Sequence, residues 1–145
     1  MTHVVIDANL GLALVVPVAY SDRTEELVRE WHAARIGLAV PELWGYEVAS
    51  GLRKVTASGS LTEEEARRAL QALWDLELEV IPASLDRQQR ALAWARRLKQ
   101  SVAYDAAYLV VAEELGVPLW TADHRLALAA RAAKVDWVRW IQGPA

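Results

Sequence analysis

Short apolar runs alternate with longer amphipathic segments along the whole chain. Residues 3–6 are largely β-branched, and the run ends abruptly at Asp7 and Asn9, as a buried strand does at its carboxyl end. Residues 76–81 alternate Leu and Val with Glu, which predicts a strand with one face more exposed to solvent. Similar patterns predict further strands at residues 36–40, 117–121 and 135–140.

The segments between these runs carry apolar residues at helical spacing and begin with helix start signals. Ser21 is a candidate N-cap, and Pro41 suits the first position of a helix that ends near Gly59. Thr62 and Glu65 have the spacing of a capping box. The predicted helices span residues 10–16, 21–34, 41–59, 62–74, 84–99, 105–115 and 123–133.

Regular alternation of strands and helices favours an α/β sandwich with a mainly parallel sheet flanked by helices. The sequence contains no internal repeat, low-complexity tract or linker, so residues 1–145 are predicted to form one domain. In open sheets of this kind, ligands bind beyond the carboxyl ends of the strands, where the strand order reverses. Polar residues that directly follow strands are therefore the first candidates for chemistry.

Composition narrows the classes of protein further. The 16 Lys and Arg against 19 Asp and Glu give a net charge of −3, which disfavours a protein that coats nucleic acid by charge alone. The absence of cysteine excludes disulfides and thiolate zinc sites. The longest apolar run, residues 10–19, is too short to span a bilayer, and the amino terminus lacks a secretory pattern. We therefore expect a cytoplasmic protein without a membrane partner.

Four acidic residues stand out by position. Asp7 directly follows a predicted strand and Asp123 comes just after another, whereas Glu47 and Asp105 lie among apolar and aromatic residues in predicted helices. Each has a simpler interpretation on its own. Asp7 and Asp123 could be N-caps, Asp105 could complement a helix dipole, and Glu47 could face solvent beside its basic neighbours.

Capping does not explain why the most apolar strand and the most apolar helix both bring a carboxylate to one end of the sheet. A shared site does explain it. Four converging carboxylates would repel one another and raise at least one pKa unless a cation neutralised them. A set of oxygen ligands without Cys or His suits a hard ion, and we expect Mg²⁺ or Mn²⁺.

The ordered segments 5–9, 46–49, 104–109 and 121–126 resemble those of PIN-domain nucleases. Within that superfamily the chain is most similar to the VapC-type toxins of toxin–antitoxin pairs, from residue 4 to about residue 140. The resemblance implies a PIN-like three-layer sandwich with a parallel five-stranded sheet, an acidic metal site and endoribonuclease activity. It also implies an antitoxin partner whose carboxyl segment covers the site, and homodimerisation.

The same resemblance assigns site residues. The four acidic positions of the family match Asp7, Glu47, Asp105 and Asp123, and its supporting polar positions match Asn9 and Thr121. We expect Asp7 and Asp105 to be direct metal ligands. Asp123 would be a ligand or hold a second ion, and Glu47 would be a ligand or orient the attacking water.

Residues that bind the substrate are less marked in the sequence. Arg53, Arg96 and Arg97 are candidates for the RNA phosphates, because guanidinium groups suit bidentate phosphate contacts. A solvated helix face is the competing interpretation. Of the seven Trp residues, Trp44 and Trp120 lie close to candidate site residues and could stack on RNA bases.

Three other classes of protein compete with the nuclease. A phosphatase with a nucleophilic Asp at the strand end usually needs a second acid two residues later, where this chain has Asn9. A phospho-receiver domain needs an Asp after its middle strand, and residues 81–83 contain none. A binding module could retain the acidic pocket and bind metal or RNA without cutting it.

Overall fold

A five-stranded sheet runs through the middle of the molecule, in a computed structural model that describes residues 2–143. All neighbouring strands are parallel, in the order β3-β2-β1-β4-β5. The strands are β1 (His3–Ile6), β2 (Gly37–Pro41), β3 (Glu79–Ile81), β4 (Leu119–Thr121) and β5 (Val138–Trp140).

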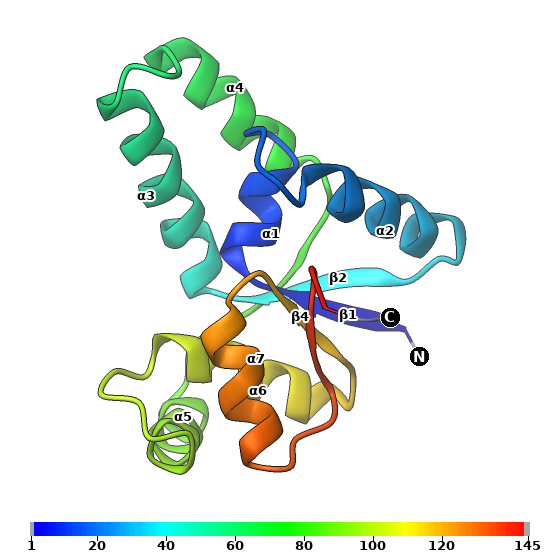
Figure 1. The fold of residues 1–145 in the computed structure, drawn as a ribbon, viewed down its shortest axis with the longest axis vertical. Coiled ribbons are helices and arrows are strands. Elements are labelled where there is room, and N and C mark those ends of the chain that lie inside the picture. The colour runs from blue at the N-terminus through cyan, green and yellow to red at the C-terminus, as the bar shows by residue number, and fades with distance from the viewer. Residues whose placement is uncertain (1, 144–145) are drawn as a thin grey trace.

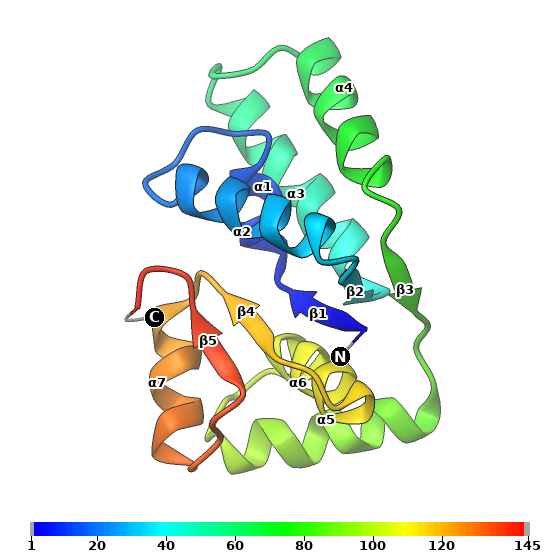
Figure 2. The same ribbon diagram turned by 90° about the vertical axis from the view of Figure 1, so that its right-hand side faces the viewer.

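Helices cover both faces of the sheet, with α1 to α4 on one side and α5 to α7 on the other (Figures 1 and 2). The helices are α1 (Ala8–Ala13), α2 (Ser21–Ala33), α3 (Leu43–Ala57), α4 (Glu63–Trp74), α5 (Leu85–Arg97), α6 (Tyr104–Leu115) and α7 (His124–Ala132). This three-layer arrangement confirms the predicted α/β sandwich. No helix within residues 2–143 is long and apolar enough to cross a membrane.

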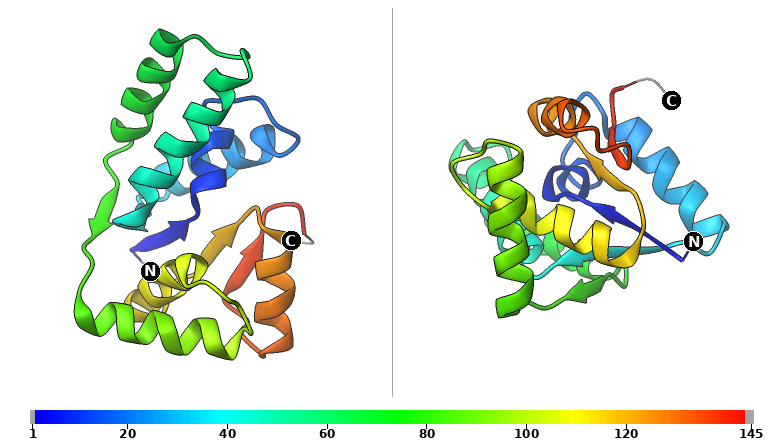
Figure 3. Two further views of the ribbon diagram at one scale, coloured as in Figure 1. Left: turned by 90° about the vertical axis from the view of Figure 1, so that its left-hand side faces the viewer. Right: turned by 90° about the horizontal axis from the view of Figure 1, so that it is seen from below.

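The strand order reverses between β1 and β4. From β1 the chain builds outward to β2 and β3, then crosses to the other side of β1 to form β4 and β5 (Figure 3). Right-handed crossovers in opposite directions place the two sets of helices on opposite faces. The carboxyl ends of β1 and β4 therefore lie side by side at the point where such sheets bind ligands.

The core is most tightly packed around the central strand. Val4, Val5 and Ile6 are each at most 1% exposed, as expected for a β-branched strand covered on both faces. Helix α6 packs against β1, β2 and β4 and buries half of its residues, including Leu109 and Val110. The residues that follow β1 are thus fixed by the best-packed part of the molecule.

Pro41 is not the first residue of a helix, as its position suggested, but the last residue of β2, where it is paired with Ile81. The next residue, Glu42, donates its N–H to the Ile81 carbonyl, so the pairing of β2 with β3 continues one residue beyond Pro41. Helix α3 begins at Leu43.

Three other elements begin at residues different from those predicted. The predicted strand 76–81 contains only Glu79–Ile81, because Glu77 adopts a left-handed φ of 56° before it. The last strand begins at Val138 rather than residue 135. The first helix begins at Ala8 rather than residue 10, because Asp7 caps it.

Candidate functional site

The four acidic residues line one cavity of about 270 Å³ at the carboxyl ends of β1 and β4. Asp7 comes from the end of β1 and Asp123 from the residue before α7. Glu47 projects from α3 and Asp105 from the first turn of α6. We call this the acidic cavity, and its complete lining is Asp7, Ala8, Asn9, Leu12, Glu47, Ser50, Gly51, Lys54, Asp105, Tyr108 and Asp123.

Asp7 is held between the two central strands. Its Oδ1 accepts a hydrogen bond from the Leu10 N–H (2.9 Å), which makes it the N-cap of α1. Its Oδ2 accepts hydrogen bonds from Thr121 Oγ1 (2.6 Å) and the Ala122 N–H (3.0 Å). Burial raises the pKa of Asp7 to about 6 against the lowering effect of these bonds, and the Asp105 charge adds to the rise.

Glu47 is half-buried and paired with a tyrosine rather than with solvent. The Tyr108 hydroxyl donates a hydrogen bond of 2.5 Å to Glu47 Oε1. Burial raises the pKa of Glu47, this hydrogen bond opposes the rise, and the Asp105 charge reinforces it. The interpretation of Glu47 as a solvated residue of a helix face is therefore wrong.

Asp105 and Asp123 occupy the starts of two helices. Gln100 Nε2 donates a hydrogen bond of 3.3 Å to Asp105 Oδ2. Burial raises the pKa of Asp105, and the Asp123 charge raises it further. Asp123 Oδ1 accepts hydrogen bonds from the N–H groups of Arg125 (2.9 Å) and Leu126 (3.2 Å) and so caps α7.

The chemistry of the cavity fits a hard divalent cation. Its donors are carboxylate, amide and hydroxyl oxygens, and none of the four acids forms an ion pair with Lys, Arg or His within residues 2–143. Asp7, Glu47 and Asp105 all have raised pKa values and each is affected by a neighbouring negative charge. A bound cation would relieve both the repulsion and the cost of burial.

The carboxylates surround this space without already enclosing a common point. Among the described residues, no three His, Asp or Glu side chains are arranged closely enough to hold an ion directly. Mg²⁺ usually keeps several of its waters and is bound through one or two carboxylates. Binding in the acidic cavity would therefore use water-mediated contacts or small side-chain rotations.

The supporting residues also lie at the site. Asn9 lines the acidic cavity. Thr121 is fully buried and links two of the acids, because its hydroxyl donates to Asp7 and accepts from the Asp123 N–H (2.9 Å). The metal-binding and catalytic roles of all these residues stay predictions.

The predicted phosphate contacts do not line the acidic cavity. Arg53 donates a hydrogen bond to Thr56 on the exposed side of α3. Arg97 donates to the Ala133 carbonyl and lies over the Trp94 ring, and Arg96, like Arg97, is on α5. Their contact with RNA stays a prediction.

Lys54, which beside Arg53 was a candidate cation for the substrate, lines the cavity two helical turns after Glu47. Tyr108 and Gln100 also lie at the site but received no role from the sequence. Tyr108 lies one turn after Asp105, so helical spacing could have identified it. Gln100 lies in the loop before α6, where no spacing rule applies.

The two Trp residues singled out near the site have different positions. Trp44 is only 1% exposed, and its Nε1 donates to the Asp7 carbonyl (3.2 Å), so it cannot stack on a base. Trp120 is partly buried against Trp31, with ring centroids 5.8 Å apart. Trp44 therefore supports Asp7 from the protein core.

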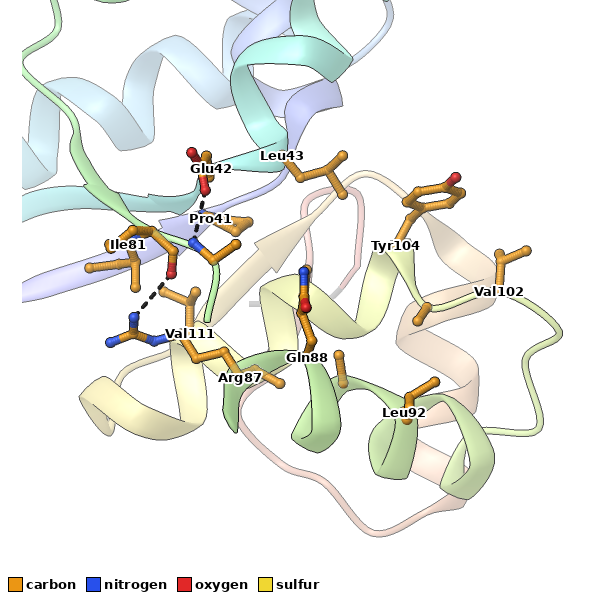
Figure 4. A pocket seen from close by; sticks show the side chains of 16 residues that line it. Pro41, Glu42, Leu43, Ile81, Arg87, Gln88, Leu92, Val102, Tyr104 and Val111 are labelled. Carbon is orange, nitrogen blue, oxygen red and sulfur yellow. Dashed lines mark hydrogen bonds between the residues drawn. The ribbon is translucent and has the colours of Figure 1, made fainter. Parts of the chain in front are cut away.

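A larger cavity of about 590 Å³ lies elsewhere, where α5 and α6 meet the junction of β2 and α3 (Figure 4). Its lining is mostly apolar and includes the exposed side chains of Leu92, Val102 and Tyr104. None of the four candidate acids lines it. Its lining is therefore distinct in chemistry from that of the acidic cavity.

Comparison with known proteins identifies related chains. Residues 4–132 match the family model described as PIN domain. Ribonuclease VapC3 from Pyrobaculum aerophilum is 36% identical over 124 residues, which cover 85% of this chain and 91% of that protein.

Solved structures share the fold at lower identity. A crystal structure of a Pyrobaculum aerophilum protein superposes with a TM-score of 0.71 and 23% identity, over 97% of this chain and 90% of that one. A chain of a toxin–antitoxin complex from Klebsiella pneumoniae gives a TM-score of 0.70 and 18% identity, over 97% and 99%. At these identities the two structures establish the fold alone.

Proposed function

The chain belongs to the PIN-domain family, and from that premise we propose that it is a metal-dependent endoribonuclease, the toxin of a toxin–antitoxin pair. It hydrolyses RNA phosphodiester bonds at the acidic cavity. The observation that carries this proposal is the convergence of Asp7, Glu47, Asp105 and Asp123 on one cavity at the reversal of strand order. The relative named a ribonuclease, which aligns over most of both chains, supports the same activity.

Mg²⁺ or Mn²⁺ is the proposed cofactor. Asp7 and Asp105 would hold the ion, Asp123 would be a further ligand or hold a second ion, and Glu47 would be a ligand or orient the attacking water. When bound, the ion supplies a water of lowered pKa and neutralises charge on the scissile phosphate.

The chain's own residues prepare this site before substrate binds. Thr121 and the Leu10 and Ala122 amides fix the Asp7 carboxylate in one orientation. Tyr108 holds one oxygen of Glu47 and leaves the other for water or metal. Lys54 is the basic side chain at the cavity and contacts a phosphate oxygen of the RNA.

The proposal includes protein partners. One structural relative comes from a toxin–antitoxin complex, which supports a cognate antitoxin that binds this chain and covers its site. The apolar cavity of Figure 4 and the exposed side chains around it support contact with a second copy, as a homodimer. The complex is expected to act in the cytoplasm.

The test is cleavage of a panel of structured RNAs by the purified, partner-free protein in Mn²⁺, in Mg²⁺ and in EDTA. Discrete products that require the metal and disappear with Asp7→Asn are expected. Asp75→Asn, a change of the same kind after α4 and outside the cavity, is the matched control and should cleave normally. Metal binding by a folded protein without any cleavage would favour the non-catalytic binding module instead.

A further inference from the structure

A second polar cavity, of about 560 Å³, lies along α7 and β5 at the edge of the sheet, where these two elements are neighbours (Figure 2). We call it the α7–β5 cavity. Its lining is Trp120, His124, Ala127, Leu128, Arg131, Lys134, Val135, Asp136, Val138, Arg139, Trp140 and Gly143. None of these residues belongs to the acidic cavity.

The α7–β5 cavity carries an excess of positive charge. Arg131, Lys134 and Arg139 are exposed, and against them the lining has one acid, Asp136. None of the three basic side chains forms an ion pair within residues 2–143. On α5, by contrast, Arg87 forms an ion pair with Glu114. The absence of ion pairs is therefore a feature of this cavity and not of every arginine on the surface.

Aromatic rings lie in the same cavity. The His124 and Trp140 rings are stacked, with centroids 3.9 Å apart and an interplanar angle of 13°. His124 is exposed, so this pair can be reached from solvent. Trp140 Nε1 is buried and has no hydrogen-bond partner among the described residues. An aromatic platform combined with free cations is the usual composition of a single-stranded nucleic-acid site.

The position of the cavity connects it to the acidic cavity. His124 directly follows Asp123, which lines the acidic cavity and caps α7. Arg131 lies in the last turn of α7, Lys134 in the turn just after that helix, and Arg139 on β5. The nine residues of α7 extend about 13 Å, enough to accompany a few nucleotides that leave the acidic cavity.

We propose that the α7–β5 cavity binds a nucleotide segment of the RNA substrate next to the scissile bond. Arg131, Lys134 and Arg139 contact its phosphates, and the His124–Trp140 pair stacks on a base. This assignment rests on the proposed ribonuclease function, because that function makes RNA the substrate of the protein. A protein partner would find a better surface in the apolar cavity of Figure 4 than in this polar, basic one.

Salt dependence of RNA binding tests the phosphate contacts. Fluorescence anisotropy of a labelled single-stranded RNA of mixed sequence is measured with the Asp7→Asn protein in EDTA, between about 50 and 200 mM salt. Adding Arg131→Ala and Lys134→Ala should reduce the slope of log K against log salt by about 0.7 for each lost contact, hence about 1.4. Arg67→Ala with Arg68→Ala, two exposed changes on α4, is the charge-matched control and should leave the slope unchanged.

A second substitution tests the aromatic contact. His124→Ala should weaken RNA binding about tenfold, in the range found when a base loses an aromatic partner. His32→Ala, on the exposed side of α2, should have no effect. Circular dichroism of each variant verifies that the fold is retained.

The outcomes separate this assignment from the proposed function. Equal salt slopes for the protein with Arg131→Ala and Lys134→Ala and for its α4 control, with unchanged affinity in His124→Ala, would overturn the assignment of this cavity to RNA. If the wild-type chain cuts no RNA in Mn²⁺ but loses RNA affinity with these substitutions, the binding site stands and the proposed catalysis fails.

Discussion

Asp7 both caps a helix and lines the acidic cavity. Three hydrogen bonds to its two oxygens fix the carboxylate, yet a carboxylate can accept about four, so an acceptor position is left for a cation or its water. Asp123 likewise caps α7 through Oδ1 while lining the cavity. One carboxylate can therefore cap a helix and bind a cation. The capping hydrogen bonds from the backbone orient these two acids before a cation binds.

Tyr108 is the residue at the site whose role can be tested most cleanly. We predict that Tyr108→Phe weakens Mn²⁺ binding by about 10- to 100-fold, because residues that orient a metal ligand have effects of that size. The fold should persist, because the substitution removes only the hydroxyl of a buried ring. Titration calorimetry of the metal-free protein measures the affinity directly.

The matched control is Tyr104→Phe, on the exposed first turn of the same helix. It should bind Mn²⁺ as the wild type does. Unchanged affinity in Tyr108→Phe would contradict the idea that its hydrogen bond positions Glu47 for the metal.

At the scale of single residues, position along the chain was the main source of information. Asp7 and Asp123 could be predicted because Asp7 directly follows β1 and Asp123 lies two residues after β4, and both strands end at the same edge of the sheet. The Tyr108–Glu47 contact could not, because it joins residues 61 positions apart on helices from opposite faces of the sheet. Burial of Trp44 was missed for the same reason, because its ring packs against Gly11 and bonds to Asp7, both more than 30 positions away in the sequence.

Helices α1 and α3 pack closely through Gly11 and Trp44. A Cβ atom on Gly11 would lie 2.6 Å from the Trp44 ring, and that ring is only 1% exposed. We predict that Gly11→Ala lowers the free energy of unfolding by about 1 kcal/mol, because overpacking outweighs the better helix propensity of Ala. Chemical denaturation measures the difference.

Gly45→Ala is the control for that measurement. Its Cβ would make an ordinary contact of 3.5 Å with Trp74, so helix propensity should dominate and the protein should be equally stable or slightly more stable. Equal stabilisation by both substitutions would show that α1 and α3 have room between them, contrary to the structure.

Among the elements, helices with strong start signals were predicted best. The capping box of Thr62 and Glu65 forms as expected, with both reciprocal hydrogen bonds. Pro41 was placed in the wrong element, because a proline suits either a helix start or a strand end and only the pairing with Ile81 decides between them. Strand lengths were overestimated where apolar residues outside the ladder, such as Val135, are buried by packing.

For the whole molecule, the buried acids predict that the metal-free protein is more stable at pH 5 than at pH 7. The folded pKa of Asp7 is about 6, above its ordinary value of 3.8, so the folded state binds a proton more tightly than the unfolded state. Stability is therefore lost as pH rises through this interval, and lowering the pH to 5 should recover about 1 kcal/mol. Glu47 and Asp105 shift in the same direction.

Below about pH 5, acid should destabilise the protein. Glu114 has its pKa lowered to about 2 by Arg87 and Arg90, so its contribution is lost as the pH falls toward that value. Thermal unfolding in EDTA across this pH range should therefore show a maximum near pH 5 that is flattened in Asp7→Asn. A metal-free protein that loses stability steadily from pH 7 to pH 5 would be inconsistent with buried, repelling carboxylates.

The overall architecture followed from the alternation of strands and helices, because parallel sheets require helical crossovers. Without the family resemblance, the sequence did not determine which strands are neighbours. The adjacency of β1 and β4, which brings Asp7 and Asp123 together, depends on the crossover after β3. The α7–β5 cavity went unpredicted because it joins residues whose separate patterns indicated only a helix face and a final strand.

The most direct test of the metal site is an anomalous-scattering map from crystals of the protein soaked in Mn²⁺ near neutral pH. We predict a peak in the acidic cavity, bound by Asp7 and Asp105 directly or through one water, with Glu47 and Asp123 within about 6 Å of the ion. A peak elsewhere, or none at an ion concentration that supports cleavage, would contradict the assignment of these four carboxylates as the metal centre.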